Sequence, residues 1–258
     1  MRAVMSSPTS EFFRGARTLL RSIAYLFRNA SLIPWMLAPA VLTITVISVA
    51  VGVTAMFGPR LLVMLVPAPA DPSWMLWWRL GLGLLTGLLI VLAVAAGWVF
   101  GNMASAPLYD VIAGKVEREQ FGLTPEKETW AEAFANAAPS IRHSIAGFGL
   151  YVAVMVPLFS LNLVPGIGSV LYTVASFVAT VFFVSRELMD VPLSRRQLSF
   201  REKLGYLKEN RAYISGHSAV VAVFLFIPFA NLFVTPLAVL GATLIFCDIE
   251  RSRGSEDL

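Results

Sequence analysis

The feature that most constrains this chain is a set of four long stretches without Asp, Glu, Lys or Arg. Two of them, residues 29–59 and 80–109, are long enough to cross a bilayer as single helices. A spanning helix needs roughly 20 apolar residues, each adding about 1.5 Å of rise. The sequence therefore predicts two spanning helices, over residues 35–58 and 76–106.

The other two uncharged stretches are interrupted near their centres by turn-forming residues. The interruptions are Asn162, Pro165, Gly166 and Gly168 in residues 144–185, and Pro228, Asn231 and Pro236 in residues 212–247. In the last stretch, the apolar arms Ala219–Ile227 and Leu237–Cys247 give only about 14–17 Å of helix each, against a hydrocarbon core of about 30 Å. We therefore expect re-entrant, hemi-penetrating helical hairpins over residues 144–185 and 214–247. Irregular backbone survives at membrane depth only where protein or a water-filled cavity satisfies it, which is often where a solute passes.

Composition supports an all-α integral membrane protein. Hydrophobic residues make up 57% of the chain and charged residues only 14%, whereas soluble proteins average about 25% charged. No linker or sustained repeat divides the chain, so we expect a single membrane domain over residues 1–258. The single cysteine, Cys247, excludes an internal disulfide and a Cys-based zinc site, and we interpret it as a packing residue. No metal or cofactor is expected.

Basic residues predict the orientation in the membrane. Five arginines and one acid, Glu11, precede the first span, and the connection over residues 60–79 holds only two arginines and one aspartate. The positive-inside rule then places the N-terminus in the cytoplasm. Because both hairpins return to the side they enter from, the C-terminus is expected there too. No apolar signal core precedes residue 30, so no cleavable secretory peptide is expected.

Amphipathic helices are expected to join these segments on the cytoplasmic side. Over residues 11–28, apolar side chains recur at helical spacing and arginines occupy the other side, which predicts an interfacial helix attracted to anionic headgroups. A second helix is predicted over residues 108–121. Capping-box patterns at Thr129–Glu132 and Ser199–Glu202 predict two more helix starts. These helices could also serve only as anchors.

A stripe of glycines marks the second predicted span. The stripe consists of Gly83, Gly87, Gly97 and Gly101, which fall within about 40° of one line at about 100° per residue. Small residues allow close approach of helices in lipid, where this packing drives association. Packing against the first span and packing between subunits both fit the pattern.

No enzyme motif is complete in this sequence. Gly216–Val220 fails the GxSxG pattern at its last position, and Gly81–Gly87 misses GxGxxG by one residue. The two histidines, His143 and His217, each lie at the cytoplasmic start of a predicted hairpin, so interfacial placement explains them better than metal binding. No carboxylate lies inside an apolar segment, which disfavours a proton or sodium relay and favours passive movement of a solute. Neither catalysis nor nucleic-acid binding is expected.

Several motifs in a fixed order carry a resemblance to a known family. They are Ala106-Pro-Leu-Tyr-Asp-Val-Ile-Ala-Gly-Lys-Val-Glu117, Met189-Asp-Val-Pro-Leu-Ser-Arg-Arg196, Leu198-Ser-Phe-Arg-Glu202, Ile227-Pro-Phe-Ala-Asn231, Thr235-Pro236 and Gly241-Ala-Thr243. Over roughly residues 12–250, the chain resembles the CysZ sulfate permeases and the wider etoposide-induced-protein-like membrane proteins. The resemblance implies a bacterial inner-membrane protein with two spanning helices and two hemi-penetrating hairpins. It also implies a homo-oligomer that admits sulfate for cysteine synthesis.

One position departs from that resemblance. In the sulfate permeases, a Gly-Leu-Arg motif before the first span holds the anion, and the matching positions here are Ser31, Leu32 and Ile33. A sulfate dianion requires N–H donors at a helix start and a cationic partner. Here the loop keeps N–H and hydroxyl donors but lacks the arginine. Arg28, three residues before Ser31, could substitute if the loop folds back.

Two functions of different classes remain open from the sequence. The first is a permease or channel for sulfate or a related oxyanion, bound by Arg28 and residues 31–33 and approaching half-helix ends near Gly166, Gly168 and Asn231. The second is a non-transporting membrane scaffold, in which residues 110–142 and 186–211 dock a cytoplasmic partner. We favour transport, with the lipid bilayer, a small inorganic anion and further copies of the chain as partners.

Overall fold

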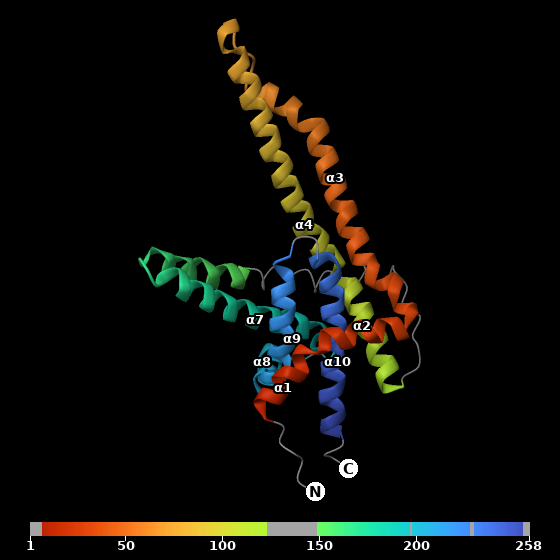
Figure 1. The fold of residues 1–258 in the computed structure, drawn as a ribbon. Coiled ribbons are helices and arrows are strands. Elements are labelled where there is room, and N and C mark those ends of the chain that lie inside the picture. The colour runs from red at the N-terminus through yellow and green to blue at the C-terminus, as the bar shows by residue number, and fades with distance from the viewer. Residues whose placement is uncertain (1–6, 123–148, 197, 228–229, 255–258) are drawn as a thin grey trace. The chain divides into compact units, whose positions relative to one another are not determined.

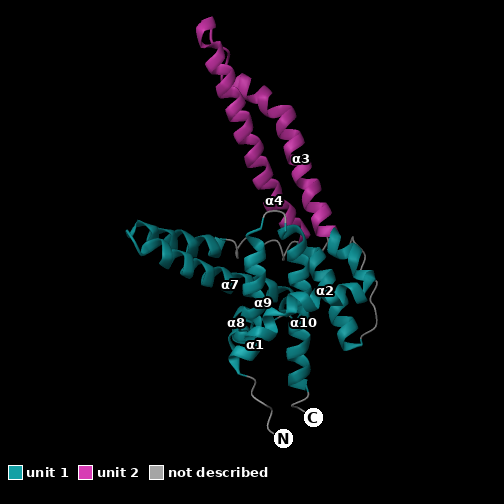
Figure 2. Ribbon diagram, in the orientation of Figure 1, with its two compact units in different colours: residues 1–37, 106–258 teal, residues 38–105 magenta. Residues whose placement is uncertain are grey.

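The computed structural model describes residues 7–122, 149–196, 198–227 and 230–254, and within these ranges it contains helices and no strand (Figure 1). They group into two compact units, residues 38–105 and residues 1–37 with 106–258 (Figure 2). The helices are α1 (Pro8–Ala16), α2 (Thr18–Arg28), η1 (Ala30–Leu32), α3 (Ile33–Leu65), η2 (Pro72–Trp74), α4 (Met75–Phe121), η3 (Ser160–Leu163), α7 (Gly168–Arg195), α8 (Phe200–Glu209), α9 (Arg211–Leu225) and α10 (Asn231–Gly254).

The unit of residues 38–105 is an antiparallel pair formed by parts of α3 and α4. At one end, the Ser105 hydroxyl donates to the Pro39 carbonyl oxygen at 3.4 Å, and at the other end the Trp78 indole donates to the Val66 carbonyl at 3.0 Å. Most of the large apolar side chains along both helices are exposed to the surroundings. In a chain of this composition, that surface suits contact with lipid rather than water.

The glycine stripe on α4 divides into two parts. A Cβ atom at Gly97 would lie 2.8 Å from the Ile47 Cα, and one at Gly101 would lie 2.8 Å from the Thr43 Cα, so these glycines allow α3 and α4 to touch backbone to backbone. At Gly83 and Gly87, by contrast, an added Cβ would meet nothing within 4 Å. Internal packing, one of the two interpretations of the stripe, therefore accounts for its second half alone.

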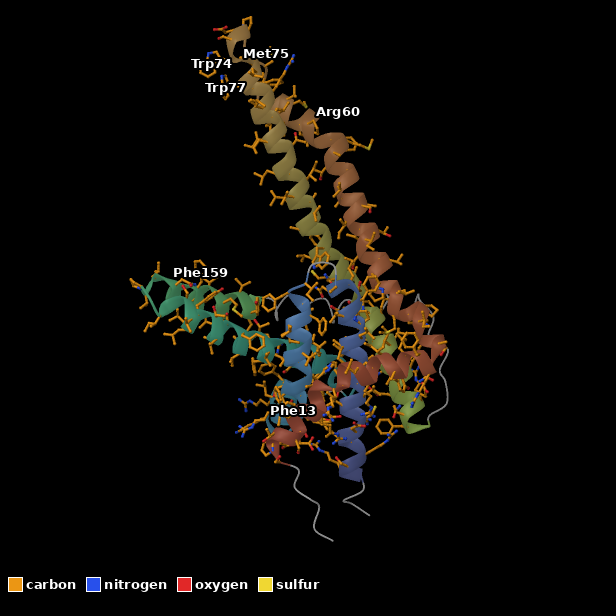
Figure 3. The ribbon with its side chains drawn as sticks, in the orientation of Figure 1. Phe13, Arg60, Trp74, Met75, Trp77 and Phe159 are labelled. Atoms are coloured by element: carbon orange, nitrogen blue, oxygen red, sulfur yellow. The ribbon has the colours of Figure 1, made fainter. Side chains whose placement is uncertain are left out.

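Aromatic residues gather where α3 connects to α4. Trp74 and Trp77 are both exposed, and Figure 3 shows them beside Met75 near the η2 turn, with Arg60 further along α3. Tryptophan prefers the level of the lipid headgroups, because its ring is apolar and its N–H is polar. This end of the pair has the composition of a membrane–water interface.

The second unit is built on very close helix crossings. A Cβ at Gly15 of α1 would lie 2.0 Å from the Tyr213 carbonyl oxygen of α9, and a Cβ at Gly216 of α9 would lie 2.0 Å from the Phe12 carbonyl oxygen. Only glycine fits at these two positions, so α1 and α9 pack backbone to backbone. Gly241 of α10 leaves similar room for the His217 ring, whose Cε1 would be 2.5 Å from an added Cβ.

Helix α10 supplies the centre of this unit. Leu240, Leu244, Ile245 and Phe246 are each at most 1% exposed. Cys247, which is free and fully buried, packs in the same core, which confirms its interpretation as a packing residue. The apolar stripe predicted over residues 108–121 is also buried, with Ile112 and Val116 packed against Leu240 and Leu244.

The first predicted hairpin turn is present. A helix over residues 149–159 runs beside α7, and η3 leads from it into the turn (Figure 1). The edge of one aromatic ring faces the other between Tyr151 and Phe183 of α7, with 5.4 Å between the ring centres. Gly166 has φ +86°, a conformation that favours glycine. A Cβ at Gly168 would lie 2.1 Å from the Leu161 carbonyl oxygen, so both glycines are required by the turn itself.

The arms of the second hairpin are longer than we expected. Helix α9 begins well before Ala219 and ends shortly before Ile227, whereas α10 extends beyond both ends of Leu237–Cys247. Asn231 begins α10, and Pro236 lies within its first turns rather than in the turn between the arms. Pro236 is the sixth residue of α10, beyond the first turn, so the helix continues through it with one backbone hydrogen bond fewer. The prediction of a short second arm, which suggested a half-depth hairpin, is therefore wrong for α10.

Three further expectations need correction or fall outside the described residues. The single helix predicted over residues 11–28 is two helices that join at Arg17, and their inner side is buried against α9 and α10. The helix predicted over 108–121 is the continuation of α4, which passes through Pro107. The capping box at Ser199–Glu202 is confirmed at the start of α8. The box at Thr129–Glu132 and His143 lie outside the described residues.

Among the residues that the structure describes, four helical segments are long and apolar enough to cross a membrane. They are Ala30–Leu65, Pro72–Phe121, Gly168–Arg195 and Asn231–Gly254. The sequence predicted two such helices; α7 and α10 add two more by length and composition.

Candidate functional site

The connection between α2 and α3 is the first candidate site, because it carries four of the residues that the sequence singled out. Arg28 is the last residue of α2, Ser31 and Leu32 lie in η1, and Ile33 begins α3. Arg28, Ser31 and Ile33 are all exposed, so a small ion can reach them. The start of α3 carries the positive end of the helix dipole, although Pro34 contributes no N–H.

Leu32 has a different role from its neighbours. Its side chain is 3% exposed and packs with Met36 of α3, Ile112 and Val116 of α4, and Leu240 of α10. A buried apolar side chain cannot contact an anion, so Leu32 could contribute only backbone groups to a binding site. Leu32 therefore fixes the loop to the core, and its N–H donates to the Asn29 carbonyl oxygen at 2.9 Å.

The same packing brings a second cation close to the loop. The Lys115 ammonium lies 4.9 Å from the centre of the Trp35 ring, a cation–π contact beside the first turn of α3. The sequence did not suggest Lys115, because it sits next to Val116 of a stripe that helical spacing describes only as apolar. The contact between α4 and α3, which sequence spacing does not encode, is what places Lys115 there.

The other predicted site residues do not join this loop. Gly166 and Gly168 lie at the turn that ends the hairpin of residues 149–159 and α7, which is far from α2 in Figure 1. Phe159, labelled in Figure 3, marks the same end. Asn231 begins α10, and its side-chain oxygen accepts a hydrogen bond from the Thr235 hydroxyl at 2.6 Å. The structure gives these three residues roles in turn formation and helix starts.

A cluster of charged side chains joins α1, α2, α9 and α10. Arg21 donates to both oxygens of Asp248, at 2.5 and 3.1 Å, Arg14 donates to Oδ2 at 3.3 Å, and the Tyr213 hydroxyl donates to the same oxygen at 2.8 Å. The guanidinium of Arg14 also lies over the Tyr213 ring at 4.6 Å. The bonds from Arg21 to Asp248 raise the pKa of Arg21 above its ordinary value, so the guanidinium remains charged.

A second buried contact joins α4 to α7. Glu117 is 8% exposed, and its Oε1 lies 3.6 Å from the Arg195 Nε. Arg195 also donates to the Asp110 carbonyl oxygen at 3.3 Å, and a Cβ at Gly114 would lie 2.8 Å from its guanidinium. The arginine is therefore packed tightly against α4, and the ion pair fixes the two helices together.

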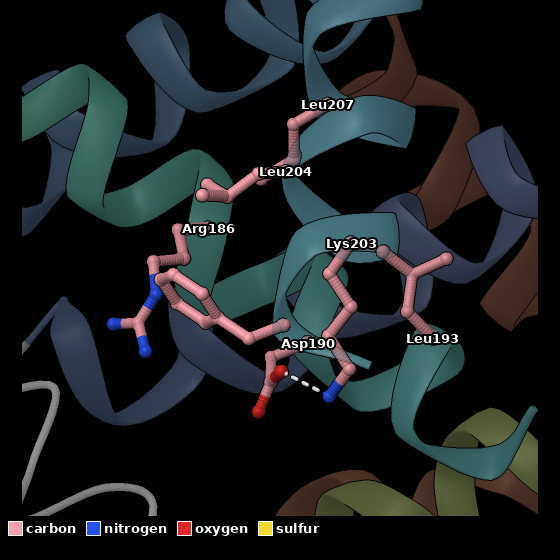
Figure 4. A pocket seen from close by; sticks show the side chains of 7 residues that line it. Arg186, Asp190, Leu193, Lys203, Leu204 and Leu207 are labelled. Carbon is pink, nitrogen blue, oxygen red and sulfur yellow. Dashed lines mark hydrogen bonds and ion pairs between the residues drawn. The ribbon is translucent and has the colours of Figure 1, made fainter. Parts of the chain in front are cut away.

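A small crevice between α7 and α8 is not a ligand site. Its volume is about 10 Å³, which is room for a single water molecule (Figure 4). Lys203 fills its polar end by donating to Asp190 at 2.6 Å and to the Ser194 hydroxyl at 2.7 Å. The crevice therefore serves to attach α8 to α7.

His217 does not lie at the interface that we expected. It is 1% exposed, and its Nε2 lies 3.0 Å from the Ala238 carbonyl oxygen of α10. Burial between α9 and α10 replaces interfacial placement, because Gly241 leaves room for the imidazole. Over the part of the chain that the structure describes, no three His, Cys, Asp or Glu side chains are grouped as metal ligands would be.

Comparison with known proteins identifies the class of this membrane protein. The family model described as Sulfate transporter CysZ/Etoposide-induced protein 2.4 matches residues 18–236, which is most of the chain. The chain belongs to this family, as the ordered motifs indicated.

Individual relatives agree with the family match. The proteins named Sulfate transporter CysZ from three strains of Vibrio cholerae serotype O1 are each 31% identical to this chain over 176 residues. The aligned part covers 67% of this chain and 68% of each relative. Over its described residues, this member of the family is helical, and its long apolar helices are typical of integral membrane proteins.

Proposed function

We propose that this protein is a permease or channel for sulfate or a related small oxyanion, in the bacterial inner membrane, that supplies sulfate assimilation and cysteine synthesis. The single observation that carries the proposal is membership of the CysZ family, whose relatives are named sulfate transporters. The long apolar helices support a role within the membrane. The same family membership makes a transporter a better interpretation than an enzyme.

The anion site of this proposal is the connection between α2 and α3. Arg28 provides charge, and Ser31 provides a hydroxyl and a backbone N–H near the positive end of α3. The N–H groups of Leu32 and Ile33 already donate to the carbonyl oxygens of Asn29 and Ala30, so these two residues shape the loop around the anion. Lys115, held beside Trp35, provides a second cation from α4. Two separate cations would then replace the missing arginine of the family motif. Gly166, Gly168 and Asn231 stay in the proposal as half-helix ends along the path.

The proposed topology has both termini in the cytoplasm and two re-entrant hairpins, 149–159 with α7 and α9 with α10, within one membrane domain. The arginines before α3 support this orientation by the positive-inside rule. Most of the apolar part of α10 is covered by protein, as re-entrant segments require. The length of α10 does not support a half-depth hairpin, so the depth that this hairpin reaches in the membrane is a matter for cysteine labelling.

Assembly as a homo-oligomer is part of the same proposal. Gly83 and Gly87 of α4 have open space where a side chain would be, although they continue the line of Gly97 and Gly101. A second copy of the chain packing on these two glycines would use the stripe over its full length.

Radiolabelled sulfate uptake into proteoliposomes tests the transport proposal. Ile33→Arg should increase uptake, because Ile33 is exposed and a guanidinium there adds charge-assisted donors beside a helix start. The double variant Arg28→Ala with Ser31→Ala, and the single variant Lys115→Met, should each reduce it. Arg201→Ala, an exposed arginine of α8, is the matched control. Uptake equal to that of empty vesicles for both the wild type and Ile33→Arg would overturn transport and favour the membrane scaffold.

A further inference from the structure

The surface formed by α1 and α2 has three lengthwise faces. Gly15, Thr18, Leu19 and Ser22 are buried against the rest of the unit. At seven-residue spacing, Phe13, Leu20 and Phe27 form an apolar line that is 58%, 69% and 76% exposed. A parallel line of arginines, Arg14, Arg21 and Arg28, lies about 100° further round the helix.

Between the two lines lies an open hollow with a volume of about 490 Å³. Its wall is formed by α1, α2 and one residue of α9, all within one compact unit. The lining residues are Ser10, Phe13, Arg14, Arg17, Thr18, Arg21 and Tyr213. Phe13 belongs both to this wall and to the exposed apolar line, so the hollow opens directly beside an apolar surface.

The hollow carries an excess of positive charge. Arg14 and Arg21 share the carboxylate of Asp248, and Arg14 also pairs with Glu11 at 3.7 Å, so these two arginines are balanced by two carboxylates. Arg17 is exposed and, within the described residues, makes no side-chain hydrogen bond or ion pair. Three guanidinium groups against two carboxylates leave one uncompensated charge, that of Arg17, which suits a group with negative charge and several acceptor oxygens.

We propose that this hollow binds the phosphate group of an anionic phospholipid, with Arg17 as its principal cationic contact. The acyl chains then lie along Phe13, Leu20 and Phe27, whose exposure to water would otherwise be unfavourable. An inorganic phosphate ion would use the arginines but leave the apolar line uncovered. The site uses residues other than those of the proposed sulfate loop, and it does not depend on sulfate transport.

Binding can be measured on the full-length protein in a non-ionic detergent. The probes are dihexanoyl phosphatidylglycerol, dihexanoyl phosphatidylcholine and inorganic phosphate, and the readout is the rise of the thermal unfolding midpoint with probe concentration. Arg17→Gln should raise the half-saturating concentration of phosphatidylglycerol about fivefold, as expected for one arginine near a lipid phosphate. Arg17→Lys should recover part of the loss. Arg201→Gln, which removes an exposed charge on α8, should change it less than twofold.

Three different outcomes of this experiment would each overturn the proposal. Equal responses to the two lipids would remove the requirement for an anionic headgroup. Equal loss of binding in Arg17→Gln and Arg201→Gln would mean that overall charge, not the hollow, attracts the lipid. A response to inorganic phosphate as strong as that to phosphatidylglycerol would assign the hollow to a free anion. Because Arg17 is exposed and unpaired among the described side chains, its substitution leaves the fold intact, which the midpoint without lipid verifies.

Discussion

Helices α4 and α10 come from equally uncharged stretches of sequence, yet they have opposite surroundings. In the most apolar part of α10, 72% of the residues are buried inside the protein, against 11% in the corresponding part of α4. Both therefore avoid water, but one is covered mainly by other helices and the other exposes its side chains to the membrane. An uncharged apolar pattern predicts that water is excluded; it does not predict whether protein or lipid replaces it.

The largest expected effect concerns which segments reach the far side of the membrane. In a Cys247→Ala background, cysteines introduced by Asn162→Cys and Phe233→Cys should resist a membrane-impermeant thiol reagent added from the periplasm. Ala70→Cys, in the exposed connection between α3 and α4, should react quickly. The measurement is the labelled fraction after a fixed time in whole cells. Labelling of all three at the same rate would mean that α7 and α10 span the membrane as α3 and α4 do.

The next largest effect is expected where helices cross backbone to backbone, at Gly15 between α1 and α9, and not at the open face of α4. Gly15→Ala should destabilise the protein by about 3 kcal/mol, because the new methyl group meets the backbone oxygen of Tyr213, which cannot move aside cheaply. Gly87→Ala is the control, and it should change stability by less than about 1 kcal/mol, since nothing lies within 4 Å. Thermal unfolding in detergent measures both. Equal midpoints would show that α1 and α9 do not cross as described.

Substitution by leucine, followed by measurement of the oligomer mass, tests the two halves of the glycine stripe on α4. Gly87→Leu should leave the monomer's stability nearly unchanged but reduce the oligomer in detergent, if a second copy packs there. Gly97→Leu should disturb α3 within the same chain, because Ile47 is already in contact. Wild-type stability and mass for the combined variant would mean that the whole stripe faces lipid.

A smaller effect is expected where charges hold α10 to α1 and α2. Asp248→Asn removes the carboxylate that Arg14 and Arg21 share, while Arg14 keeps Glu11 and Tyr213 keeps an acceptor. It should cost about 1–3 kcal/mol after allowing for the partial exposure of both arginines. Glu250→Gln removes a carboxylate 3.6 Å from Arg253, three positions further along the same helix, and should cost less than about 0.5 kcal/mol. Equal shifts of the unfolding midpoint would mean that the cluster contributes no more than a surface ion pair.

Local chemistry explains what the sequence predicted well. The turn at Gly166 and Gly168 requires glycine because of its φ angle and its close backbone contact, and the stripe over residues 108–121 is buried as its spacing indicated. In both cases the signal lies within a few residues of the structure that it predicts. The predicted break after the second span failed, since Pro107 is accommodated inside α4 and the helix continues.

The parts that the sequence did not predict depend on contacts between distant segments. Asp248 meets Arg14 and Arg21 across more than 220 residues, and Lys115 reaches Trp35 only because α4 packs beside the start of α3. The burial of His217 likewise depends on Gly241, on another helix. No periodicity in one segment reports such pairs, so the cation beside the loop and the charged hollow could be found only from the packed structure.

The smallest effect is expected at the start of α8, where the capping box of Ser199 and Glu202 involves only neighbouring residues. The Glu202 N–H donates to the Ser199 hydroxyl oxygen at 3.4 Å, and the Ser199 N–H donates to the Glu202 carboxylate at 2.7 Å. Ser199→Ala should cost about 1 kcal/mol, the usual loss for an N-cap. The hydrogen bonds from Ser199 lower the pKa of Glu202 below its ordinary value of 4.5.

Because the pKa of Glu202 is lower in the folded protein than in the unfolded chain, its contribution to stability is complete above about pH 4.5. That contribution is lost as the pH falls through the folded pKa. The difference in unfolding midpoint between the wild type and Glu202→Gln should therefore shrink between pH 6 and the acidic limit at which the protein remains folded. A difference that stays constant over this range would mean that the Glu202 carboxylate does not cap α8 in solution, whereas Arg201→Gln, one residue away, should show no such dependence.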